Sequence, residues 1–117
     1  MSFFDSDIVR SEMAEIHELQ EDVYENFMKF PYMNNADWAL HIDQLSKLIE
    51  NQKIVYARLS LSDDPDAKEM KEKIMESAQS MGLPADVDVG KMFDQMSEVI
   101  DMMKRQTTWH FILWVLL

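Results

Sequence analysis

The stretch FPYMNN (residues 30–35) separates two long runs of helical periodicity and decides the fold of the chain. Pro31 disfavours a helical conformation at Phe30, and its ring prevents it from continuing a helix itself. Each run is long enough for a helix of about 25 residues, and two such helices joined by a short turn fold back on each other. The stretch therefore predicts a long antiparallel helix hairpin.

Both runs have an apolar stripe of the kind that a bundle helix needs. The first helix begins at a cap supplied by Asp5 or Ser6 and runs to about Phe30. The second is capped by Asn35 and runs to about Leu61. The first stripe is formed by Val9, Met13, Ile16, Leu19, Val23, Phe27 and Phe30. The second is formed by Trp38, Ile42, Leu45, Leu48, Ile49, Val55, Tyr56 and Leu59.

Two shorter helices are expected after the hairpin. Asp64 is a cap and Pro65 suits the first position of a third helix, which ends near Met81 with Gly82 as its stop signal. Its apolar residues are few, which predicts packing at the edge. A fourth helix begins between residues 88 and 91. Its apolar stripe is formed by Met92, Phe93, Met96, Val99, Ile100 and Met103.

Composition supports an all-α fold. Hydrophobic residues make up 47% of the 117 residues, so the chain is not compositionally disordered. It has only two glycines and no segment that alternates with period two, which argues against strands. We therefore predict a small helical bundle, with residues 1–106 as one helical domain and residues 107–117 as an apolar C-terminal tail. The lack of cysteine excludes thiol catalysis, disulfides and thiolate metal sites.

The strongest candidate for function is an acidic face on the first helix. The net charge of −11 repels nucleic acid and favours basic protein surfaces. Carboxylates spaced by three and four share one side of a helix. Their simplest interpretation is a solvated face that also serves as a docking surface. The predicted partner-binding carboxylates are Glu12, Glu15, Glu18, Glu21, Asp22 and Glu25. Met102 lies off the fourth stripe and is a second candidate contact.

Enzymatic readings have weaker support. All-α nucleotide pyrophosphohydrolases hold magnesium with helical E-x-x-E and E-x-x-D pairs, and EMAE (Glu12, Glu15) and EVID (Glu98, Asp101) fit these letters. No lysine or asparagine pattern completes a nucleotide pocket, so this remains the alternative. Diiron sites need E-x-x-H, which no histidine in the chain satisfies. His41 is expected at the core boundary. No metal, cofactor or catalytic residue is assigned.

The tail after Gln106 holds eight apolar side chains and one histidine in residues 109–117. Nine helical residues extend ~13 Å, too short to span an apolar membrane core of ~30 Å. Such a segment needs an apolar environment. Burial against its own bundle or a partner is expected first, self-association next and shallow membrane insertion last. Its candidate anchors are Trp109, Phe111 and Trp114.

Three stretches resemble a small domain of unknown function found in cyanobacteria and in the phages that infect them. They are FFDSDIV (residues 3–9), ARLSLSDDPDAKEM (residues 57–70) and GLPADVDVGKMFDQM (residues 82–96). The family opens with a similar F-F-D-S-E-I-V stretch and usually ends soon after the M-F-x-Q-M helix. The resemblance implies a cytoplasmic helical protein, and it brings no catalytic residues.

Together these features predict an acidic, non-enzymatic interaction or regulatory protein. It would bind a basic surface of a host protein complex if the chain is phage-encoded, and transcription machinery is one candidate because its nucleic-acid-binding surfaces are basic. No direct nucleic-acid binding and no membrane span are expected, while a homo-oligomer through the tail stays open. A structural subunit of a larger assembly, such as a virion, is a further alternative.

Overall fold

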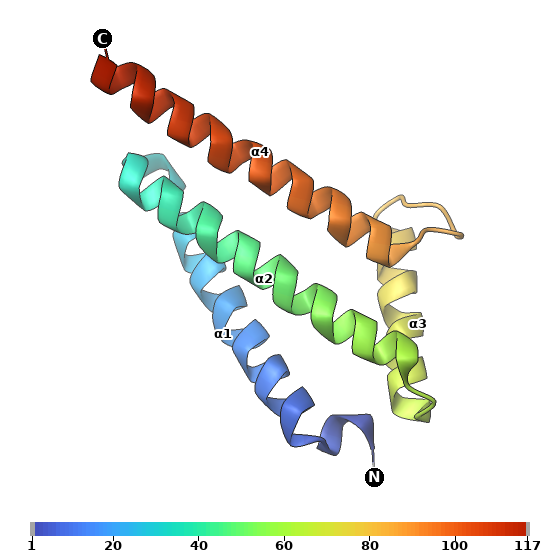
Figure 1. Ribbon diagram of the computed structural model, residues 1–117. Coiled ribbons are helices and arrows are strands. Elements are labelled where there is room, and N and C mark those ends of the chain that lie inside the picture. The colour runs from blue at the N-terminus through green and yellow to red at the C-terminus, as the bar shows by residue number, and fades with distance from the viewer. Residues whose placement is uncertain (1, 117) are drawn as a thin grey trace.

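The computed structural model describes the backbone of residues 2–116 and the side chains of residues 2–29, 31–105 and 116. Two short 3-10 turns and four α-helices follow one another along the chain (Figure 1). They are η1 (Phe3–Asp5), α1 (Asp7–Met28), η2 (Phe30–Tyr32), α2 (Asn35–Leu61), α3 (Pro65–Ser80) and α4 (Val89–Leu116). No strand occurs between residues 2 and 116, so the predicted all-α fold is confirmed.

The central element is α2. Figure 1 shows α1 on one flank of α2 and α4 on the other, with both running antiparallel to it. The third helix crosses the C-terminal end of α2 and contacts η1, and the C-terminal end of α4 extends past the first turn of α2. The molecule is elongated, with extents of 58 × 31 × 22 Å. The hairpin of α1 and α2 is as predicted.

The hairpin turn lies one or two residues from the predicted boundaries. The first helix ends at Met28, and residues 30–32 form η2, whose φ values proline suits. Asn34, not Asn35, occupies the N-cap of α2, and its Oδ1 accepts a hydrogen bond from the backbone N–H of Asp37 at 2.8 Å. Asn35 is the first helical residue, so that cap prediction was wrong by one position.

The third helix begins and ends on the predicted signals. Asp64 Oδ1 accepts a hydrogen bond from the backbone N–H of Asp66 at 2.8 Å, and Pro65 is the first helical residue. Gly82 follows the C-cap with φ of 95°, a left-handed conformation that glycine adopts without strain. Asp64 Oδ2 also accepts from the backbone N–H of Phe3 at 2.6 Å, so the same carboxylate joins η1 to α3.

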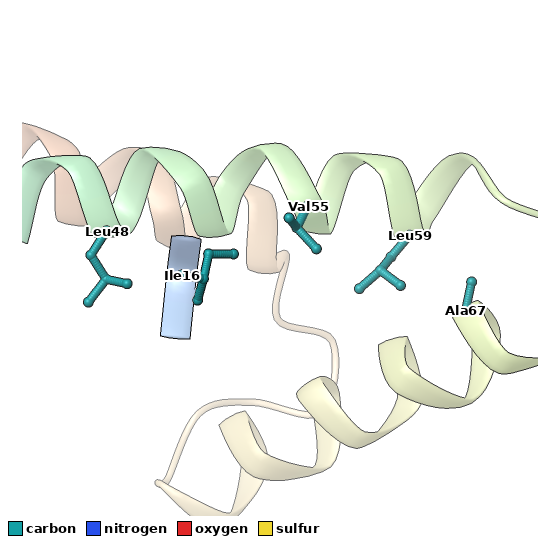
Figure 2. Close-up of a cluster of buried hydrophobic side chains, with 5 residues drawn as sticks. All are labelled: Ile16, Leu48, Val55, Leu59 and Ala67. Carbon is teal, nitrogen blue, oxygen red and sulfur yellow. The ribbon is translucent and has the colours of Figure 1, made fainter. Parts of the chain in front are cut away.

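Two apolar clusters use two faces of α2. On the α1 side, Figure 2 shows the buried members of the larger cluster, which are Ile16, Leu48, Val55, Leu59 and Ala67. On the α4 side, Ile42 and Ile49 pack against Ile100. Burial of each aliphatic side chain contributes about 1.5–3 kcal/mol. The central helix therefore joins the two flanking helices into one bundle.

Several predictions about the stripes need correction. Phe27 and Val99 are 65% and 55% exposed, and Met13 and Met96 are also exposed rather than buried. Met13, Met96 and Val99 line hollows between helices that are not fully closed, and periodicity alone does not reveal such gaps. The fourth helix was also expected to be short. It has 28 residues and continues without a break through residues 107–116, whereas α3 is short as predicted.

Candidate interaction surfaces on the first and fourth helices

The outer side of α1 carries a row of exposed carboxylates. The buried residues of this helix, Val9 and Ile16, face α2, and the helical repeat turns the acidic positions away from them. The exposed members of the predicted set are Glu15, Glu18, Glu21, Asp22 and Glu25. One of them, Glu21, forms an ion pair with His17 one turn earlier at 3.1 Å. The structure thus brings five of the six predicted carboxylates onto one solvated surface, called the acidic face below.

Glu12 is the exception in the predicted set. Its two carboxylate oxygens accept hydrogen bonds from Nε of Arg58 on α2, at 3.0 Å each. The Glu12 side chain is only 22% exposed. Its assignment to the solvated face was therefore wrong, because sequence spacing places a residue on a helix without showing which neighbouring helix reaches it.

The arrangement of the described side chains gives little support for the magnesium site of the hydrolase alternative. Glu12 and Glu15 lie on α1, whereas Glu98 and Asp101 lie on α4, and these helices occupy different flanks of α2. Within residues 2–29 and 31–105, no three Asp, Glu or His side chains are grouped closely enough to hold a metal ion. The four residues of the hydrolase alternative do not form a site in this arrangement.

His41 lies deeper than the boundary position that the sequence predicts. It is 4% exposed, and its ring centroid is 5.8 Å from that of Trp38. Burial lowers the pKa of His41 below its usual value of 6.5. Nδ1 has no hydrogen-bond partner among the described residues. His41 is thus a buried histidine on an apolar helix face, and among the described side chains it belongs to no group that could hold a metal ion.

The fourth helix carries an exposed apolar surface beside its contact with α2. Met102 is 52% exposed, as its position off the stripe suggested. A hollow of about 360 Å³ lies next to it between α2 and α4. Its lining residues are Ile49, Met92, Gln95, Met96, Val99 and Ile100. The side chains of Trp109, Phe111 and Trp114 lie outside the described residues, although the helical backbone runs through them.

A second hollow, of about 230 Å³, lies where η1 and all four helices meet. Its polar groups are the Gln52 amide and the Tyr56 hydroxyl, and the rest of its lining is apolar. The lining residues are Phe4, Met13, Ile16, Gln52, Val55, Tyr56, Leu59, Met70, Ile74 and Phe93. Sequence reasoning missed both hollows, because each depends on how separate helices are spaced and not on a local motif.

One ion pair fixes the flank of α4 that faces α2. Lys53 Nζ lies 2.5 Å from Oδ1 of Asp94, and this hydrogen-bonded carboxylate raises the pKa of Lys53. Next to this ion pair, the ring of Tyr56 on α2 contacts the ring of Phe93 on α4, with centroids 6.0 Å apart. These two contacts lie beside the apolar cluster of Ile42, Ile49 and Ile100, whereas Val99 and Met102 are more than half exposed.

The helices of the described residues offer no candidate for crossing a bilayer, since none combines the necessary length and apolar character. No curated protein and no solved structure matches the chain. Residues 1–107 match the family described as a domain of unknown function (DUF1825). This range includes the acidic face of α1 and the exposed Met102, and it extends over nearly the whole chain. The protein is therefore a member of the DUF1825 family.

Proposed function

We propose that this protein is a non-enzymatic interaction or regulatory protein that docks on a basic surface of another protein through the acidic face of α1. The observation that carries the proposal is the exposure of Glu15, Glu18, Glu21, Asp22 and Glu25 on one side of a single helix. Charges with no buried contact of their own contribute little to folding. Their concentration is better explained by attraction of a partner.

The geometry of the face sets the chemistry of the partner. Glu15 and Glu25 are ten residues apart, which corresponds to about 15 Å along the helix axis. A suitable partner presents several lysine or arginine side chains over that length. Protein surfaces that bind nucleic acid have this character, so a host transcription complex of a cyanobacterium is our leading candidate, with a phage origin for the chain.

Apolar anchoring would add affinity to this electrostatic contact. Charged residues at the edge of a protein–protein interface speed association and set specificity, whereas buried apolar contacts slow dissociation. The candidates for such contacts are the exposed Met102 and the tail with Trp109, Phe111 and Trp114. The acidic face alone predicts binding that weakens as salt rises.

The test compares two triple charge reversals that change the net charge equally. Glu15→Lys, Glu18→Lys and Glu21→Lys together reverse the acidic face. The matched control reverses the exposed Glu69, Glu72 and Glu76 of α3.

Tagged proteins are used to capture partners from a cyanobacterial lysate at low salt, with mass spectrometry as the readout. The proposal expects a partner that is captured by the wild type and the α3 control and lost with the α1 reversal. Equal capture by all three proteins would disprove the docking role of α1.

A further inference from the structure

One face of α4 packs on α2 and another is left exposed. Phe93, Ile100 and Met103 contact the apolar cluster of α2. On another side of the helix, Val99 is 55% exposed and Met102 is 52% exposed. Leu116, at the end of the same helix, is 77% exposed. Apolar side chains repeated on an exposed helix face are unusual in a monomer.

The exposed positions continue a heptad repeat over the rest of the helix. Residues three and four apart alternate along it, as a coiled-coil seam requires. The seam positions are Met92, Gln95, Val99, Met102, Gln106, Trp109, Leu113 and Leu116. Six of the eight are apolar and none is charged. We propose that a second copy of this chain covers this face, with the two α4 helices packed as an antiparallel coiled coil related by a two-fold axis.

Charge along the helix selects the antiparallel arrangement and its register. Lys91, Glu98 and Arg105 are seven residues apart and flank the seam on one side. In antiparallel coiled coils the same flank of each helix meets its equivalent. When Val99 shares a layer with Met102 of the second copy, Glu98 lies opposite Arg105 of the second copy, and the symmetry makes this pair twice.

The same register also matches the polar seam positions. It places positions 95 and 106, the two glutamines of the seam, in the same layer. It places Met92 in a layer with Trp109. A shift by one heptad in either direction sets Glu98 against Glu98 or Arg105 against Arg105, and it separates the two glutamine positions into different layers. This register therefore satisfies the charged flank and the polar seam positions together, and it leaves Leu113 and Leu116 beyond the start of the second α4.

The length and position of α4 are sufficient for such an interface. In this register the seam positions of the two α4 helices overlap from Met92 to Trp109, which corresponds to about 26 Å. The hollow lined by Met96 adds apolar surface beside this seam. The acidic face of α1 lies on the other flank of α2 and stays outside the interface. The dimer would cover Met102 and Trp109, which leaves the acidic face, Phe111 and Trp114 for a docking partner. The dimer and docking through the acidic face can therefore each fail without the other.

The first experiment measures mass in solution by sedimentation equilibrium over a range of concentrations. We expect a wild-type dimer, and monomers for Val99→Glu and Met102→Glu with the helical circular dichroism signal retained, since both side chains are exposed. Leu61→Glu is the matched control, because Leu61 is 87% exposed on α2 and should leave the dimer unchanged. A monomeric wild type, or a dimer that survives both seam variants, would overturn the proposal.

The second experiment tests the register. Glu98→Arg and Arg105→Glu should each raise the dimer dissociation constant about tenfold, because each creates two like-charge pairs. The double variant restores opposite charges across the axis and should return to within about threefold of wild type. Losses that simply add in the double variant would contradict the antiparallel register.

Discussion

Arg58 on α2 holds Glu12 on α1 through Nε, which lies 3.0 Å from both carboxylate oxygens. This contact joins the two helices of the hairpin near the end where α1 begins. It also separates Glu12, which supports the fold, from the five exposed carboxylates of the acidic face. The two groups should respond differently to neutralisation.

Glu12→Gln should lower the free energy of unfolding by about 0.5–1 kcal/mol, since the pair is partly exposed and screened by solvent. Glu15→Gln serves as its control and should change stability by less than about 0.3 kcal/mol. Urea denaturation measures both values. Equal effects of the two substitutions would show that the Arg58 contact contributes nothing specific.

The pH dependence of stability should report His41. Burial lowers its pKa in the folded state below 6.5, so the unfolded state binds the proton more readily. The stability is fully present above about pH 6.5 and is lost as pH falls through the folded pKa.

His41→Gln should flatten the decline of unfolding free energy between about pH 7.5 and about pH 5.5, where carboxylates contribute little. A decline that is unchanged in His41→Gln would contradict this assignment.

The hydrolase alternative predicts an activity that we do not expect. Purified protein should release no pyrophosphate from common nucleoside triphosphates when magnesium is added, because Glu12 and Glu15 lie on a different helix from Glu98 and Asp101 and are not grouped with them. A colorimetric pyrophosphate assay is sufficient. Activity that disappears in Glu98→Gln and Asp101→Asn would reverse the ranking.

Removal of the tail should separate folding from association. A chain ending at Gln106 keeps the cluster formed by Ile42, Ile49 and Ile100, so a cooperative thermal transition and the helical signal should persist. The same truncation removes Trp109 and the seam positions after it, so it should weaken the dimer or partner binding. A truncated chain without a cooperative transition would place the tail in the protein's own core.

The boundaries of the fold were largely predictable because they depend on local signals. Asp64, Pro65 and Gly82 mark the ends of α3 by chemistry that acts within a few residues. The apolar stripe of α2 follows from helical periodicity. In contrast, the sequence predicted a boundary between the helical domain and the tail at residue 107, because the composition changes there. The backbone of α4 continues as a helix through this change.

The parts that could not be predicted depend on neighbours distant in sequence. Nothing near Glu12 indicates that Arg58, 46 residues later, reaches it. Phe27 and Val99 follow the apolar period but stay more than half exposed, because burial depends on how closely the neighbouring helices approach. The acidic face was predictable as a surface, because exposure is the default for carboxylates on a helix. Its role is a proposal about binding that the fold alone does not determine.

Zero-length carbodiimide cross-linking of the captured complex tests the central claim most directly, because it joins carboxylates only to lysines in direct contact. The docking proposal predicts that cross-linked peptides come from the acidic face, at Glu15, Glu18, Glu21, Asp22 or Glu25, and that they join lysines of the partner. Cross-links confined to carboxylates of α3 or α4, with none on α1, would contradict it.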